Sequence, residues 1–132
     1  MSYTNNPTSI LAGTGIVVAP TTGTGANTIT ISASGTQILA VRTAIATPVT
    51  VTTGDEVISV EVPGPVAVAV NLPLGVTGQV FNIKDGLGLA SPATPITITP
   101  AAGTIDGAAT ATIDAPYGSL TLVFASTEWK IL

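Results

Sequence analysis

The sequence has no cysteine and no histidine, and it is poor in charged and aromatic side chains. Disulfide bonds, thiolate nucleophiles and Cys/His zinc sites are therefore excluded, as are Ser-His-Asp and Cys-His catalytic groups. Charged residues make up 8% of the chain, against roughly 25% in an average soluble domain. Disorder is also disfavoured, because 45% of the residues are hydrophobic and disordered chains are low in apolar residues.

Positive charge is scarce as well, with three basic residues, seven acidic residues and a net charge of −4. Arg42, Lys84 and Lys130 stand far apart in the sequence, whereas nucleic-acid binding requires several cations on one surface. We therefore expect neither nucleic acid nor an anionic membrane as a partner. No apolar run is long enough for a spanning helix, which needs about 20 residues. The N-terminus lacks the basic region of a signal peptide, so we expect synthesis in the cytoplasm.

The carboxylates offer little catalytic chemistry, because most of them lie at strand ends or beside glycine. At such positions an aspartate stabilises a turn through its own side chain. The segment 84–88 has one carboxylate, too few for a calcium loop, and a hairpin turn is favoured there. We expect no enzyme, no cofactor and no metal. The acidic residues are Asp55, Glu56, Glu61, Asp85, Asp106, Asp114 and Glu128.

Two zones differ in composition. Residues 1–35 are rich in glycine, threonine, asparagine and proline, with short candidate strands at 9–12, 16–19 and 28–32. The Gly-Thr-Gly segments at 13–15 and 23–25 have no helix or lysine after them, so they indicate tight turns and not a phosphate site. Because this zone has few large apolar residues, we expect an extended arm or β-strip that leans on another surface.

Residues 36–132 show repeated apolar and polar alternation between turn signals, which is typical of β-strands. Ten prolines and fourteen glycines leave no long helical window. The sequence therefore predicts an all-β protein: a β-sandwich or barrel-like domain of antiparallel strands with an extended N-terminal arm. The predicted strands are 37–45, 49–53, 56–62, 66–72, 79–84, 96–99, 109–113, 119–125 and 128–132.

One predicted strand, 66–70, is apolar on both faces, with Val66, Val68 and Val70 on one of them. Such a strand needs cover on both sides. A neighbouring subunit would supply that cover, and burial within one chain is the alternative; the pattern does not separate the two. Trp129, the single tryptophan, is expected in the core or in the same subunit contact.

The segment from about 53 to 132 resembles a small β-domain that recurs in bacteriophage virion proteins, including tail fibres and capsid-associated proteins. The resemblance implies a β-sandwich or barrel-like subunit, commonly a homotrimer, within a virion. None of its landmarks is a catalytic signature. They are Leu72-Pro73, Gly78-Gln79, Ile83-Lys84-Asp85, Ile96-Thr97-Ile98, Gly103-Thr104-Ile105-Asp106-Gly107, Tyr117-Gly118-Ser119-Leu120 and Glu128-Trp129-Lys130-Ile131.

With this resemblance, the leading hypothesis is a trimeric capsid decoration (cement) protein that clamps neighbouring copies of the major capsid protein. The chain is short, its first zone suits an arm that gains order on a partner, and its low charge suits permanent contacts. The alternative is a short tail-fibre or receptor-binding protein that contacts the host surface through its loops. The residues expected to anchor the arm are Tyr3, Ile10, Leu11, Ile16 and Val17.

Overall fold

A computed structural model describes residues 16–20, 29–33 and 39–132 of the chain, and it divides the chain between Ile38 and Leu39 into two units. In the first unit, β1 (Ile16–Pro20) and β2 (Ile29–Ala33) pair as an antiparallel hairpin. These strands confirm the predicted strands at 16–19 and 28–32, whereas the predicted strand at 9–12 lies outside the described residues. The sequence predicts the division between the zones at residues 35 and 36.

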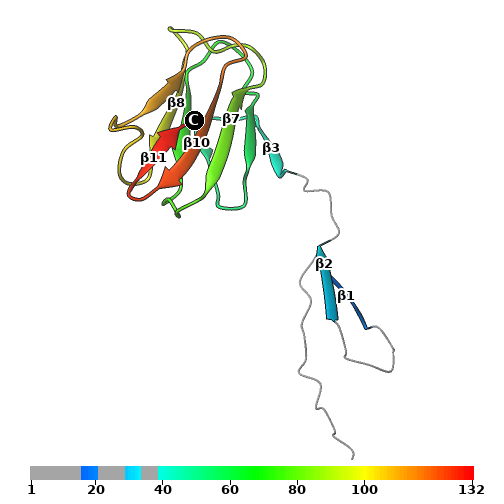
Figure 1. The fold of residues 1–132 in the computed structure, drawn as a ribbon. Coiled ribbons are helices and arrows are strands. Elements are labelled where there is room, and N and C mark those ends of the chain that lie inside the picture. The colour runs from blue at the N-terminus through cyan, green and yellow to red at the C-terminus, as the bar shows by residue number, and fades with distance from the viewer. Residues whose placement is uncertain (1–15, 21–28, 34–38) are drawn as a thin grey trace, which may run out of the picture. The chain divides into compact units, whose positions relative to one another are not determined.

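The second unit is built entirely from strands and the turns between them (Figure 1). Each of its nine strands overlaps one of the nine predicted segments, which confirms the predicted all-β class. The strands are β3 (Val41–Ala44), β4 (Val49–Thr50), β5 (Val57–Val60), β6 (Val68–Leu72), β7 (Val80–Asp85), β8 (Ile96–Pro100), β9 (Ala111–Ile113), β10 (Ser119–Ala125) and β11 (Glu128–Ile131).

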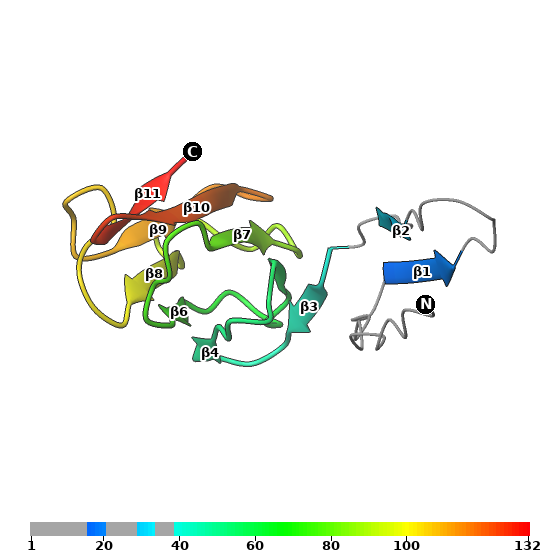
Figure 2. The same cartoon turned by 60° about the horizontal axis from the view of Figure 1, so that its bottom comes forward.

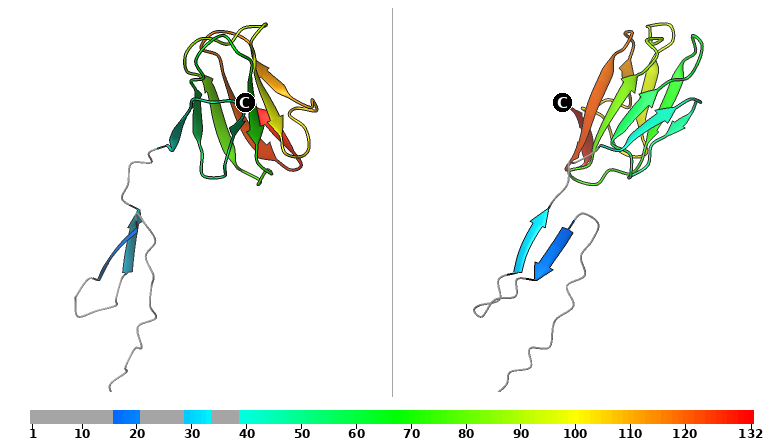
Figure 3. Two further views of the ribbon diagram at one scale, coloured as in Figure 1. Left: turned by 180° about the vertical axis from the view of Figure 1, so that it is seen from behind. Right: turned by 90° about the vertical axis from the view of Figure 1, so that its right-hand side faces the viewer.

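These nine strands form two sheets that face each other (Figure 2). The five-stranded sheet has the order β11-β10-β7-β5-β3, and the four-stranded sheet has the order β4-β6-β8-β9. From β3 to β8 the chain alternates strictly between the two sheets, so strands that are neighbours in sequence do not pair. The layers can be followed from behind and from the side in Figure 3.

Both sheets are mixed, which corrects the predicted antiparallel domain. The pairings β3–β5, β5–β7, β4–β6 and β6–β8 are parallel. Parallel neighbours need a crossover connection, and here each crossover carries a strand of the opposite sheet. The chain then closes with the antiparallel pairings β8–β9, β7–β10 and β10–β11. A two-layer sandwich of this kind is the coarse architecture that the sequence predicts.

The core lies between the sheets because strands such as β6 and β8 bury alternate aliphatic side chains on one side. In β6, Val68, Val70 and Leu72 are buried and the residues between them are exposed. Trp129 packs in the same core, with its ring centroid 5.3 Å from the rings of both Phe81 and Phe124. Aromatic pairs at this separation add to the stabilisation from burial.

Of the two alternatives for strand 66–70, this core shows burial within one chain for Val68 and Val70 in place of the expected subunit contact, and it gives Trp129 the core position that was one of its two expected places. Val68 and Val70 point from the four-stranded sheet into the core beneath the chain's own five-stranded sheet, and Trp129 is completely inaccessible to solvent. The outer face of β6 carries Ala69 and Asn71, both exposed. The small alanine explains why the pattern reads as apolar on both faces: one face is buried, and the other bears little side chain. Val66 precedes β6 and is exposed.

Candidate functional site

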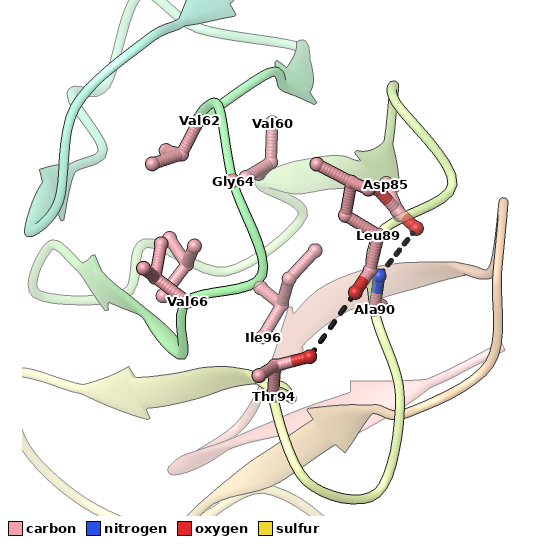
Figure 4. A pocket seen from close by; sticks show the side chains of 10 residues that line it. Val60, Val62, Gly64, Val66, Asp85, Leu89, Ala90, Thr94 and Ile96 are labelled. Carbon is pink, nitrogen blue, oxygen red and sulfur yellow. Dashed lines mark hydrogen bonds between the residues drawn. The ribbon is translucent and has the colours of Figure 1, made fainter.

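A small hollow opens at the end of the sandwich where β5 and β7 finish and β6 and β8 begin (Figure 4). Its volume is about 10 Å³, which is room for about one water molecule. Small-molecule pockets usually have about 300 Å³ or more, so this hollow is not of that kind. Its walls are mostly aliphatic: Val60, Val62, Gly64, Val66, Val68, Asp85, Leu89, Ala90, Thr94 and Ile96.

Asp85 is the carboxylate in this hollow, and its oxygens are occupied by backbone donors. Oδ1 accepts a hydrogen bond from the N–H of Gly88 at 3.0 Å, and Oδ2 accepts from Ala90 at 3.0 Å and Tyr117 at 3.1 Å. Burial alone would raise the pKa of Asp85, but these hydrogen bonds outweigh it and lower the pKa below its ordinary value of 3.8. The carboxylate therefore anchors two loops.

This role confirms that Asp85 stabilises its own turn, through the bonds to residues 88 and 90. The predicted hairpin at this place is wrong, because the chain crosses from β7 to β8 in the opposite sheet. A pattern of turn residues identifies a break between strands without saying which strand pairs next.

An exposed aromatic ring lies at the same end of the sandwich. The ring of Tyr117 rests against Gly88, where an added Cβ would lie 2.5 Å from ring atoms. Lys84 donates a hydrogen bond to the carbonyl of Tyr117, and its Nζ lies 5.7 Å from the ring centroid. Leu87 and Leu89 flank Gly88 in sequence and are also exposed. Leu87, Leu89 and Tyr117 therefore form an exposed apolar surface, and Asp85 holds the backbone of their loops in place.

A second buried carboxylate, Asp55, ties the beginning of the unit together. Arg42 of β3 donates to it from Nε at 2.9 Å and from Nη2 at 3.0 Å. Nη2 also donates to the carbonyl of Thr50, and Thr52 donates to Asp55 from its backbone and its hydroxyl. Burial raises the pKa of Asp55, but the bonds from Arg42 and Thr52 more than reverse this, so the net pKa is lowered. Arg42 thus faces inward from β3.

The outer face of β3 is apolar. Leu39, Val41 and Ile45 are 53%, 65% and 71% exposed, and Thr43 on the same face is exposed as well. The carbonyls of Ala40 and Ala44 accept hydrogen bonds from Val57 and Glu61, so the even-numbered residues face β5. Because backbone groups alternate along a strand, those of Val41, Thr43 and Ile45 point away from β5. Within residues 39–132, nothing pairs with that side of β3.

The opposite edge of this sheet, β11, is covered by the segment before β9. The N–H of Trp129 donates to the carbonyl of Thr104, and the N–H of Asp106 donates to the carbonyl of Trp129, both at 2.9 Å. Glu128 accepts bonds from Lys130, the Thr104 hydroxyl and the Gly107 backbone, which lower its pKa from 4.5 to about 2. This edge combines backbone pairing with charge.

The residues singled out from the sequence are not brought together. The side chains of Tyr3, Ile10, Leu11, Ile16 and Val17 lie outside the described residues, although Ile16 and Val17 belong to β1. Val66 borders the small hollow, and Val68, Val70 and Trp129 are core residues.

The sequence reasoning missed the apolar face of β3. The predicted strand 37–45 includes Leu39, Val41 and Ile45, but the prediction assigns no faces to them. Arg42 between them carries the missing information, because a lone arginine among apolar residues marks the opposite side of an alternating strand. Its partner, Asp55, was predicted only as a turn residue.

Three further features bear on function: metal ligands, membrane-spanning helices and similarity to known proteins. Among the residues that the structure describes, no three His, Cys, Asp or Glu side chains gather as metal ligands. The described parts of the chain contain no helix of the length and apolarity needed to cross a membrane. No protein-family model and no curated protein matches the chain.

Proposed function

We propose that this chain is a structural subunit of a bacteriophage virion, and within that class a trimeric capsid decoration protein that clamps neighbouring subunits of the capsid. One observation carries the structural role: large apolar side chains lie exposed on the edge strand β3 and beside its two ends, at Val41, Leu39 and Ile45. Exposed apolar surface of this kind marks protein-protein contacts. The resemblance of residues 53–132 to virion β-domains supports the choice of particle.

The chemistry of the second unit supports a binding role over an enzymatic one. Its two buried carboxylates, Asp55 and Asp85, are occupied by Arg42 and by backbone N–H groups. A catalytic carboxylate needs access to its substrate, and these two side chains serve the fold. In this proposal residues 1–35 attach the protein to the capsid, and the second unit joins copies to one another.

The test is to mix the purified full chain with undecorated heads of the phage that encodes it. Cement function predicts saturable binding at a fixed number of sites per head and a raised temperature of head disruption. Removal of residues 1–35 is expected to abolish attachment while the second unit still self-associates. If heads bind none of the full chain and disrupt at an unchanged temperature, the cement proposal is wrong.

The exposed loop end favours a second candidate, a short tail-fibre or receptor-binding protein. Tyr117, Leu87 and Leu89 present an apolar surface on loops that Asp85 holds in place, and rigidly held loops are common recognition sites. In that case the full chain binds host cells and not heads. Tyr117→Ala would then weaken binding to the cells, whereas Thr99→Ala, on the outer face of β8, would leave it unchanged.

A further inference from the structure

The free edge of β3 is unusual within this unit because the other sheet edges are protected. β4 and β9, which end the four-stranded sheet, have two and three residues. β11 is paired with the segment 104–106 and carries Glu128 and Lys130. Short strands, charges and covering segments are the ways in which proteins prevent unwanted pairing at an edge. β3 is longer than β4 and β9, with four residues, and within residues 39–132 its outer side carries neither a charge nor a covering segment.

We propose that β3 pairs with β3 of a second copy of this chain, antiparallel about a two-fold axis at Thr43. In such a pair each copy presents the same surface to the other. The outward N–H and C=O groups of the two Thr43 residues would exchange hydrogen bonds, and those of Val41 would pair with those of Ile45 of the second copy. The two five-stranded sheets would join into one continuous sheet.

The side chains of β3 favour this register. On the outer face it sets Val41 against Ile45 and Thr43 against Thr43, which are the β-branched and threonine pairs that stabilise antiparallel strands. On the inner face it sets Arg42 against Ala44, so the two guanidinium groups are not directly opposite. It also brings Val41 and Ile45, the most exposed apolar side chains of this edge, side by side across the pair.

The identity of the partner follows from the same residues. An edge without charge selects a strand without charge, and β-branched side chains select β-branched neighbours. β3 meets both requirements on its outer face, because its one charged residue, Arg42, is bonded to Asp55 on the inner face. This contact does not depend on the proposed role in a virion. A trimer would have to use another surface, and a threefold axis combined with this two-fold axis gives six copies.

The test replaces Thr43 with charge and measures the mass of the full chain in solution at micromolar to millimolar concentrations. We expect the unchanged chain to associate in even numbers. Thr43→Lys and Thr43→Glu each place like charges opposite one another, so each should halve the mass and weaken pairing by about tenfold or more. An equal mixture of the two variants should restore the original mass, because opposite charges then meet at the axis.

Two controls keep the test specific. Thr99→Lys and Thr99→Glu make the same changes at an exposed position of β8, an inner strand of the other sheet, and should not alter the mass. Thr43→Pro removes an outward N–H that the β3–β5 pairing does not use, so it should also halve the mass while far-ultraviolet circular dichroism stays unchanged.

A full chain of one or three copies at all concentrations overturns the proposal. Failure of the mixed variants to restore the original mass overturns it as well. Because these measurements contain no heads, their failure leaves the cement proposal untouched, and loss of head binding leaves the pairing untouched.

Discussion

The two edges of the five-stranded sheet differ in how their outward backbone groups are paired. At β11, the backbone groups of Trp129 bond to Thr104 and Asp106, and Lys130 bonds to Glu128 above them. At β3, the outward backbone groups of Val41 and Thr43 meet no partner within residues 39–132, and apolar side chains stand beside them. The first edge is sealed by the chain itself.

The difference shows which edge of this unit is closed by its own residues and which edge can accept a further strand. The β11 side combines a fully buried tryptophan with a charged surface, which is the arrangement of a finished edge. The β3 side has its charged residue, Arg42, turned inward to Asp55 and its apolar residues turned outward. Because Asp55 neutralises Arg42 on the inner side, no charge on the outer side of β3 opposes a strand partner.

At the β11 edge, replacing Trp129 should cause the largest loss of stability. Trp129→Ala empties the space beside Phe81 and Phe124, and we expect it to lower the free energy of unfolding by about 3 to 5 kcal/mol. Chemical denaturation followed by circular dichroism measures this loss. Trp129→Phe is the control: it keeps an aromatic ring and removes a buried N–H that has no partner among the described residues, so its loss should be smaller.

A loss from Trp129→Ala of less than about 1 kcal/mol would contradict the placement of this residue in the core. Self-association through β3 would have to be measured alongside, because a mass change would add its own contribution to the apparent stability.

The β3 side should respond to Asp55→Asn, because Arg42 then loses its charged partner. We expect a loss of about 1 to 2 kcal/mol at neutral pH, reduced by the partial exposure of Arg42. The folded-state pKa of Asp55 lies below 3.8, so its stabilisation is present above that pH and disappears as the pH falls through the folded-state pKa. Denaturation at several pH values should therefore show the two proteins converging in acid.

A difference between the wild-type chain and Asp55→Asn that stays constant down to strongly acidic pH would contradict this account. Glu56→Gln is the matched control, since Glu56 accepts a hydrogen bond from the backbone of Ala40, whereas the hydrogen bonds of Arg42 go to Asp55 and Thr50.

The smallest effect on stability is expected at the partly exposed pair of Glu128 and Lys130 on β11. Lys130→Met removes the largest cause of the lowered pKa of Glu128, so this pKa should rise from about 2 towards 4.5. The bonds from Thr104 and Gly107 remain and should stop the rise short of 4.5. Titration of the side-chain carboxyl by nuclear magnetic resonance measures it, with Lys84→Met as the unaffected control. A wild-type Glu128 that titrates near 4.5 would show that this network does not form.

The strands of the second unit could be predicted because each one alternates between a buried and an exposed face. Ser119–Ala125 is predicted at its observed limits, and β8 is predicted to within one residue. Burial on one side imposes the period of two that the sequence displays. The same logic failed at β6, where the exposed Ala69 looks apolar in sequence although its face is not covered.

Strand pairing could not be predicted in the same way. Alternation reports which face of a strand is buried, and it is equally consistent with a parallel or an antiparallel neighbour. The crossovers between β3 and β8 run through the opposite sheet, so short connections did not mean hairpins here. The two-residue turn at Asp106 and Gly107, both with positive φ, is a place where local sequence and local structure agree.

The account's central claim concerns the amide groups of β3, and hydrogen exchange of the full chain at low and high protein concentration tests it most directly. The amide of Thr43 points away from β5, and that of Arg42 points towards it. We predict that protection of Thr43 increases with concentration while protection of Arg42 stays the same. Exchange at Thr43 that is equally fast, or equally slow, at every concentration would contradict pairing between copies at this edge.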